Sequence, residues 1–229
     1  SGNHHQNYDE AALLVRAAKK SGADAVKLQT YTADTMTLHS DKEWFRVGGK
    51  DNPEKWKGKT LYELYTEAFT PWEWQPKLKQ LADEIGIMLF SSPFDTTAVD
   101  FLEKMCVPCY KIASYEVTDF LLLRKVAQTG KPVIMSVGYA PLQEIGFALK
   151  TLRENGAKDI AILHCVTGYS AKPKATDMHL STIKDMQTRF GVVGGFSDNN
   201  AGIEIPLMAI VAGASIIEKH IILDRKTGG

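Results

Sequence analysis

The chain has few cysteines and no excess of either charge. Three cysteines among 229 residues do not form a disulfide scaffold, and they favour a reducing compartment. Lysine plus arginine and aspartate plus glutamate each number 27, so the clustered positive charge of a nucleic-acid-binding surface is lacking. No apolar run approaches the roughly 18 residues of a membrane span. We therefore expect a cytoplasmic protein that binds neither nucleic acid nor membrane.

Short β-rich runs alternate with helix-favouring runs along the whole sequence. The strand candidates are 25–30, 86–92, 109–114, 132–138, 160–166, 192–198 and 215–223. The helix candidates are 9–21, 71–84, 96–105, 118–129, 142–154, 180–190 and 203–212. Such βα repeats imply an α/β fold with parallel strands and right-handed crossovers. An open doubly wound sheet is the rival, but its glycine-rich phosphate fingerprint is absent.

The helix candidate 9–21 precedes the first of these strands, which implies that another strand comes before this helix. Residues 1–4 are therefore expected to be the tail of a truncated eighth strand, and eight βα units predict one TIM (β/α)8 barrel over residues 1–229. Residues 31–70 form a long excursion after a strand, with a short helix expected near Leu61–Ala68. Connections of this length in compact domains are usually lids or binding loops. We expect a lid-like insertion here.

The strand-like run 215–223 contains two polar side chains where apolar ones are expected. Because successive strand residues alternate between faces, Glu218 and His220 share one face, and Ile217, Lys219 and Ile221 take the other. A carboxylate and an imidazole are costly to bury without partners. The pattern therefore predicts a site for a metal or a polar substrate.

Two lysines also lie inside predicted strands. Lys27 shares a face with Gln29, opposite Val26 and Leu28, and Lys111 lies within 109–114. Interior ammonium groups suit an anion such as a phosphate with a carboxylate, and a structural ion pair is the alternative. Hydroxyl groups gather at strand carboxyl ends, where they can hold phosphate oxygens. They belong to Ser91, Ser92, Ser114, Ser136, Thr167 and Ser197.

Seven runs occur in one order, namely GADAVKLQTYT, FSSPFD, YKIASYE, PVIMSVG, ILHCVTGY, GGFSD and EKHIILDR. In this order and spacing they resemble the sialic acid synthase family. The runs SGNHHQN and LYELYTEAFTPWEW are most similar to its pseudaminic acid synthase branch. The resemblance implies condensation of phosphoenolpyruvate with the aldehyde of an N-acetylated hexose, a 6-deoxy-diacetamido hexose in that branch. The products are a nine-carbon 2-keto acid and phosphate, released with C–O cleavage.

The resemblance also implies roles for individual residues. The groups that would hold phosphoenolpyruvate are Lys27, Lys111, Ser92, Ser114, Thr167 and Ser197. The groups that would line the pocket or face the sugar are Gln29, Phe94, Glu116, Tyr169 and Glu218. Among these, Lys27, Lys111 and Glu218 would be catalytic. His220 would bind a divalent cation, Mn²⁺ or Mg²⁺, that polarises the aldehyde oxygen.

Three departures from the family pattern matter. The family's second metal histidine is here Asn199, whose amide oxygen holds a transition metal less strongly than imidazole does and makes Mg²⁺ more plausible. The family's catalytic glutamate would precede Ser1, and its antifreeze-like domain would follow Gly229. We therefore expect the barrel portion of a longer homodimeric protein.

Other interpretations stay open at this point. One is a non-catalytic relative that has lost metal-dependent activity, and another is a phosphate-using barrel lyase with a Schiff-base lysine. The sequence does not fix the acceptor sugar, so precursors of neuraminate and legionaminate also remain candidates.

Overall fold

The computed structural model describes residues 2–48, 56–166, 174–224 and 226. The chain divides into two compact units, Ser1–Val107 with Ile221–Gly229 as unit 1, and Pro108–His220 as unit 2. Both combine parallel strands with helices, which confirms the expected α/β class. Within the described residues no helix is long and apolar enough to cross a membrane. The organisation of residues 1–229 as a single barrel domain stays a prediction.

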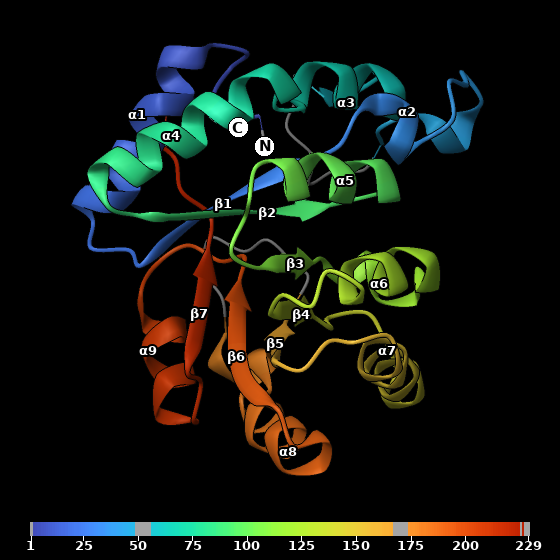
Figure 1. Cartoon of the computed structure of the whole chain (residues 1–229), viewed down its shortest axis with the longest axis vertical. Coiled ribbons are helices and arrows are strands. Elements are labelled where there is room, and N and C mark those ends of the chain that lie inside the picture. Colours follow the sequence, from blue (N-terminus) through green and yellow to red (C-terminus); the bar gives the residue numbers. More distant parts are fainter. Residues whose placement is uncertain (1, 49–55, 167–173, 225, 227–229) are drawn as a thin grey trace. The chain divides into compact units, whose positions relative to one another are not determined.

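Unit 1 is built on two parallel strands, β1 (Ala25–Thr30) and β2 (Met88–Pro93). Its α-helices are α1 (Tyr8–Lys20), α2 (Ala33–Met36), α3 (Leu61–Ala68), α4 (Gln75–Ile85) and α5 (Thr96–Lys104). Two 3-10 helices, η1 (Glu43–Phe45) and η3 (Trp72–Trp74), lie between them. Figure 1 shows α1 and α4 lying along the same side of the strand pair.

One apolar core joins α1 and α4 to the strands of unit 1. Val26 of β1 and Leu89 of β2 are buried in it, and Leu28 packs against it. Val26 and Leu28 therefore face the helices. Strand alternation then directs Lys27 and Gln29 to the opposite side, as the sequence predicts.

The strand tail predicted at residues 1–4 is wrong for the residues that the structure describes. Residues 3–6 form turns, and the backbone of His5 and Gln6 has positive φ values of 47° and 54°, which an extended strand does not permit. Asn7 then caps α1, because its side-chain oxygen accepts the amides of Asp9 and Glu10 at 2.8 and 3.2 Å. The segment is thus a helix entry.

The insertion 31–70 contains α2, η1 and α3 within its described parts, 31–48 and 56–70. The short helix falls at Leu61–Ala68, as predicted. A capping box begins it, since Thr60 Oγ1 accepts the Glu63 amide at 3.1 Å and Glu63 Oε2 accepts the Thr60 amide at 2.8 Å. The lid function of the insertion stays a prediction.

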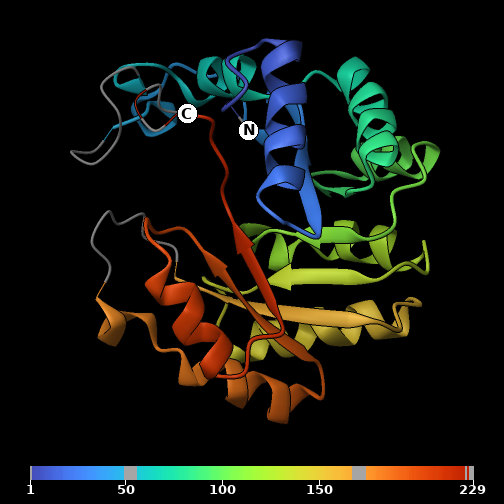
Figure 2. The same cartoon turned by 90° about the vertical axis from the view of Figure 1, so that its left-hand side faces the viewer.

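The described residues of unit 2 contain five parallel strands that pair in chain order. They are β3 (Tyr110–Ile112), β4 (Val133–Ser136), β5 (Ile160–Cys165), β6 (Val193–Asp198) and β7 (Ile216–Lys219). The helices are α6 (Phe120–Ala127), α7 (Leu142–Glu154), α8 (Ser181–Phe190) and α9 (Glu204–Val211), with 3-10 helices η4 (Ser114–Thr118) and η5 (Ala175–Met178). Figures 1 and 2 show β6 and β7 running in the same direction, with the helices outside the strands.

A close approach of three strands in unit 2 requires glycine. A Cβ atom on Gly195 of β6 would lie 2.4 Å from Leu163 Cδ2 and 2.5 Å from the carbonyl oxygen of Ile216. Because strands on both sides occupy that space, a side chain could fit only if the sheet moved. Gly195 thereby allows β5, β6 and β7 to pack at their observed spacing.

Candidate functional site

The centre of the candidate site is an ion pair within unit 2. Lys111, in the middle of β3, is 2% exposed, and its Nζ donates to Glu218 Oε1 of β7 at 3.1 Å. In a flat sheet, β3 and β7 would be roughly 19 Å apart, four strand spacings. The contact therefore shows that the five strands of unit 2 curl, so that side chains from the first and last strands meet.

The strand register places five polar side chains on one face of this curled sheet. Neighbouring residues in a parallel pair point the same way, and every second residue along a strand repeats that direction. Following the register from β3 to β7 gives the row Lys111, Ser136, Cys165, Ser197 and Glu218. Lys111 and Glu218 therefore lie on the same face of the curled sheet and meet within unit 2.

Ser197 and Cys165 connect the ion pair to the middle strands. Ser197 Oγ donates to Glu218 Oε1 at 3.1 Å. The thiol of Cys165 is buried, which raises its pKa, while side-chain hydrogen bonds with Ser197 and Ser114 lower it. The net shift is upward, so the group is a protonated thiol at neutral pH and is no nucleophile in this setting.

A second carboxyl group lies just beyond the end of β3. Burial raises the pKa of Glu116 to about 7, although its own backbone amide and the charge of Lys111 act in the opposite sense. Among the described residues, Glu116 Oε2 and the buried hydroxyl of Ser136 have no hydrogen-bond partner. Buried polar atoms without a hydrogen-bond partner are rare in folded proteins. A polar ligand at this end of the sheet could supply the missing hydrogen bonds.

Asn199 directly follows β6, and two hydrogen bonds hold its side-chain amide in place. Nδ2 donates to Cys165 Sγ at 3.5 Å and to the Val166 carbonyl at 3.4 Å. The neighbouring Asp198 has a fully buried side chain that pairs with Lys219. Asp198 Oδ1 also accepts the backbone and side-chain amides of Asn200 at 3.0 and 2.9 Å. This network fixes the turn that carries Asn199.

The side chains that the structure describes do not form a complete set of metal ligands. Within the described ranges no group of three or more histidine, cysteine, aspartate or glutamate side chains could hold a metal ion. His220 is exposed and follows the last residue of β7, so its predicted place in a strand is wrong. His220 and Asn199, the two predicted metal ligands, are fewer than the three protein ligands of typical catalytic zinc sites.

Unit 1 carries the remaining described candidates. Lys27 and Gln29 lie on the side of β1 that faces away from the α1 and α4 core. Ser92 is buried at the end of β2, and in the described chain its hydroxyl has no partner. Phe94 packs edge-on against Tyr31 with ring centroids 5.5 Å apart, so that the Phe94 ring is held in place. Its predicted contact with a ligand stays a prediction.

Two predicted residues, Thr167 and Tyr169, lie outside the described residues. The convergence of Lys27 with Lys111 and His220 on one cavity also stays a prediction, since these groups belong to different units.

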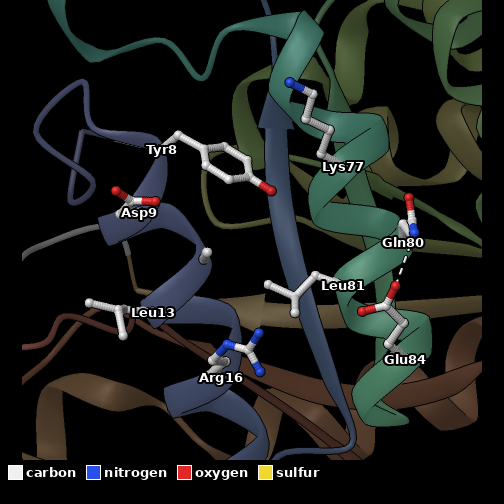
Figure 3. A pocket seen from close by; sticks show the side chains of 9 residues that line it. Tyr8, Asp9, Leu13, Arg16, Lys77, Gln80, Leu81 and Glu84 are labelled. Atoms are coloured by element: carbon white, nitrogen blue, oxygen red, sulfur yellow. Dashed lines mark hydrogen bonds between the residues drawn. The ribbon is translucent and has the colours of Figure 1, made fainter.

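A groove between α1 and α4 in unit 1 is separate from these residues (Figure 3). The side chains that line it are Tyr8, Asp9, Ala12, Leu13, Arg16, Lys77, Gln80, Leu81 and Glu84. It lies between two helices and contains none of the predicted site residues. We therefore assign it no part in the chemistry.

Sequence reasoning missed the roles of Cys165 and of the Asp198–Lys219 pair. Cys165 enters the site because it is level with Ser197 in the register of β5 and β6, which single-strand patterns do not reveal. Lys219 does lie opposite Glu218, as alternation predicts, and it is level with Asp198. The opposite charges of Asp198 and Lys219 on two consecutive predicted strands could have indicated this pair.

Comparison with known proteins agrees with this arrangement. The chain is 42% identical over 225 residues to the pseudaminic acid synthase of Helicobacter pylori, covering 98% of this chain and 64% of that protein. It is 35% identical over 231 residues to the N,N'-diacetyllegionaminic acid synthase of Legionella pneumophila, covering 99% of this chain and 63% of that protein. The chain thus spans somewhat less than two thirds of the length of these relatives.

A solved structure has the same fold. The N-acetylneuraminic acid (sialic acid) synthetase of Leptospira borgpetersenii, crystallised with citrate, matches with a TM-score of 0.83 at 30% identity, over 99% of this chain and 72% of that one. The NeuB family matches residues 14–229. These similarities confirm the resemblance to sialic acid synthases, and the chain belongs to the NeuB family.

Proposed function

We propose that the protein carrying this chain condenses phosphoenolpyruvate with the aldehyde of an acetamido hexose to give a nonulosonic acid and phosphate. Family membership supports this reaction class. The single structural observation that carries it is the Lys111–Glu218 pair, because a buried ammonium on a curled parallel sheet suits a small anion. A purely structural ion pair would leave the buried Ser136 hydroxyl and Glu116 oxygen unexplained.

C3 of phosphoenolpyruvate would form a bond with the aldehyde carbon, whose oxygen takes up a proton and becomes a hydroxyl group. Water would add to C2 and lose its protons. The bond between C2 and the bridging oxygen would then break, so that phosphate leaves with that oxygen and C2 becomes the ketone. Lys111 would bind the anion as a charge partner, and the hydroxyls of Ser114 and Ser197 would donate to its oxygens. The roles expected for Lys27 and Ser92 of unit 1 stay predictions.

Two carboxyl groups have different tasks in this proposal. Glu218 accepts a hydrogen bond from the Lys111 ammonium, and its remaining oxygen would orient a sugar hydroxyl. Glu116 has a pKa of about 7 and so exchanges its proton near neutral pH, which is the condition for general acid–base work on a sugar oxygen. Gln29, Phe94 and Tyr169 stay predicted contacts of the sugar.

The acceptor is proposed to be a 6-deoxy-diacetamido hexose. The support is that pseudaminic acid synthases from Helicobacter pylori and Campylobacter jejuni are 42% and 40% identical to the chain, against 35% for the legionaminic acid synthase. A divalent cation, Mn²⁺ or Mg²⁺, stays the predicted cofactor. Since His220 and Asn199 offer two donors only, we propose that it binds together with substrates, and we assign no step to it.

Phosphate release tests the proposal. The full-length protein is incubated with phosphoenolpyruvate and either a 6-deoxy-diacetamido hexose, N-acetylmannosamine, or no sugar, each with and without MnCl₂. We expect phosphate only when both substrates are present, and fastest with the diacetamido sugar. Lys111→Met should abolish release, whereas the exposed control Lys150→Met should not. Absence of phosphate with every sugar would refute the proposed function.

The homodimer stays a prediction, which sedimentation equilibrium of the full-length protein would test. The cytoplasmic location also stays a prediction.

A further inference from the structure

Two exposed tyrosines stack on each other in unit 2. Tyr115 lies in η4, three residues after β3 ends, and Tyr139 lies three residues after β4 ends. Their ring centroids are 4.1 Å apart at an interplanar angle of 26°, and their hydroxyl groups share a hydrogen bond. The side chains nevertheless remain 70% and 49% exposed. The pair therefore presents aromatic ring surface to solvent.

The position of the pair relates it to the candidate site. β3 and β4 are parallel neighbours, so the loops that follow them emerge at the same edge of the sheet. The Gly138 amide donates to Ser114 Oγ at 3.1 Å, and this bond joins the residues immediately before the two tyrosines. Glu116 follows Tyr115 directly. The stacked pair is thus fixed beside two residues that the proposed function assigns to substrates.

The chemistry of the exposed surface selects between the two substrates. The face of an aromatic ring carries negative electrostatic potential, which disfavours the carboxylate and phosphate of phosphoenolpyruvate. A neutral acetamido sugar instead offers C–H groups on its chain or ring, acetamide methyls and, in a 6-deoxy sugar, a further methyl. Binding pockets combine such aromatic surface with a few polar groups that fix orientation. Glu116 and Ser114 are polar groups of this kind.

We propose that Tyr115 and Tyr139 form a stacking surface for the acetamido sugar at the mouth of the site. This inference rests on the proposed function for its ligand. The rings contact apolar C–H and methyl groups, while the linked hydroxyls hold the two loops together. The pair determines affinity for the sugar and leaves phosphoenolpyruvate binding unaffected.

The experiment separates the sugar from the anion. Binding of the 6-deoxy-diacetamido hexose is followed by saturation-transfer NMR, phosphoenolpyruvate affinity by calorimetry, and KM and kcat by phosphate release. Wild type is compared with Tyr115→Ala, Tyr139→Ala and the double Phe variant. Phe147→Ala, which removes a 51% exposed aromatic from α7, is the control. Melting temperatures identify any variant that is misfolded.

We expect each Ala variant to raise the KM for the sugar about tenfold, equivalent to about 1.4 kcal/mol, with phosphoenolpyruvate affinity unchanged. The double Phe variant keeps the rings and should retain sugar affinity, which a purely loop-linking role would not predict. Sugar binding that is equal in wild type and folded Ala variants would overturn the inference and leave the proposed function standing. Failure of wild type to bind any acetamido sugar or to release phosphate would overturn both.

Discussion

The buried ion pair predicts an asymmetry between its two partners. Lys111 is 2% exposed, whereas Glu218 is 22% exposed. Glu218→Gln keeps the size of the side chain but leaves a buried ammonium without its carboxylate. Lys111→Met keeps the aliphatic stem and leaves a carboxylate that water and Ser197 still solvate. Removing the more exposed partner should therefore destabilise the protein more.

The magnitudes follow from desolvation. Glu218→Gln leaves the buried charge of Lys111 without its carboxylate, which should lower the free energy of unfolding by about 3 kcal/mol. The upper limit is the cost of removing the proton of an ordinary lysine at pH 7, about 4 to 5 kcal/mol. For Lys111→Met, the loss should be about 1 kcal/mol, the typical value of one hydrogen bond.

Urea unfolding at pH 7 measures both losses on matched proteins. Glu154→Gln provides the control, since Lys150 and Glu154 are 3.8 Å apart and both more than 60% exposed, so that its effect should stay below about 0.5 kcal/mol. A loss for Lys111→Met that equals or exceeds the loss for Glu218→Gln would show that the ammonium is not held in a desolvated position.

Three further predictions concern unit 2. The pKa of Glu116 is raised from 4.5 to about 7 in the folded state, so between these pH values the carboxyl group keeps its proton only when the protein is folded. The melting temperature of wild type should therefore fall relative to that of Glu116→Gln as the pH rises from 4.5 to about 7, and it should fall no further above that. A difference that stays constant with pH would contradict this. Gly195→Ala should cost about 1 to 3 kcal/mol in urea unfolding, because its Cβ meets neighbouring strands, while Gly146→Ala in helix α7, where nothing lies within 4 Å, should stabilise by about 0.5 to 1 kcal/mol. Lys219→Met should lower the free energy of unfolding by about 3 kcal/mol, because it leaves the buried Asp198 carboxylate without its ammonium partner. Adding Asp198→Asn should recover part of that loss. If it recovers nothing, the buried charge is not the cause of the loss.

Local patterns predicted much of the fold. The strand Ala25–Thr30 and the helix Leu142–Glu154 have the expected bounds, because apolar periodicity and flanking turn residues are properties of adjacent positions. The facing of Lys27 and of Glu218 also follows from alternation within one strand. These features require no knowledge of which strand lies beside which.

Features that depend on distant residues were not predicted. The N-terminal segment forms turns because His4 is buried and hydrogen-bonds Thr70 Oγ1 at 3.0 Å, a contact between positions 66 residues apart. β7 ends at Lys219 rather than continuing to residue 223, which removes His220 from the strand. The stacking of Tyr115 on Tyr139 depends likewise on the pairing of β3 with β4.

The proposed function depends on whether the buried ammonium of Lys111 binds the anionic substrate. Titration calorimetry of phosphoenolpyruvate into the full-length wild-type protein, Lys111→Met and the control Lys150→Met measures this binding without sugar and without turnover. We expect the affinity to fall at least 100-fold in Lys111→Met, a loss of about 2.8 kcal/mol, and to be unchanged in the control. Equal affinity in wild type and a folded Lys111→Met variant would show that Lys111 does not bind the anion.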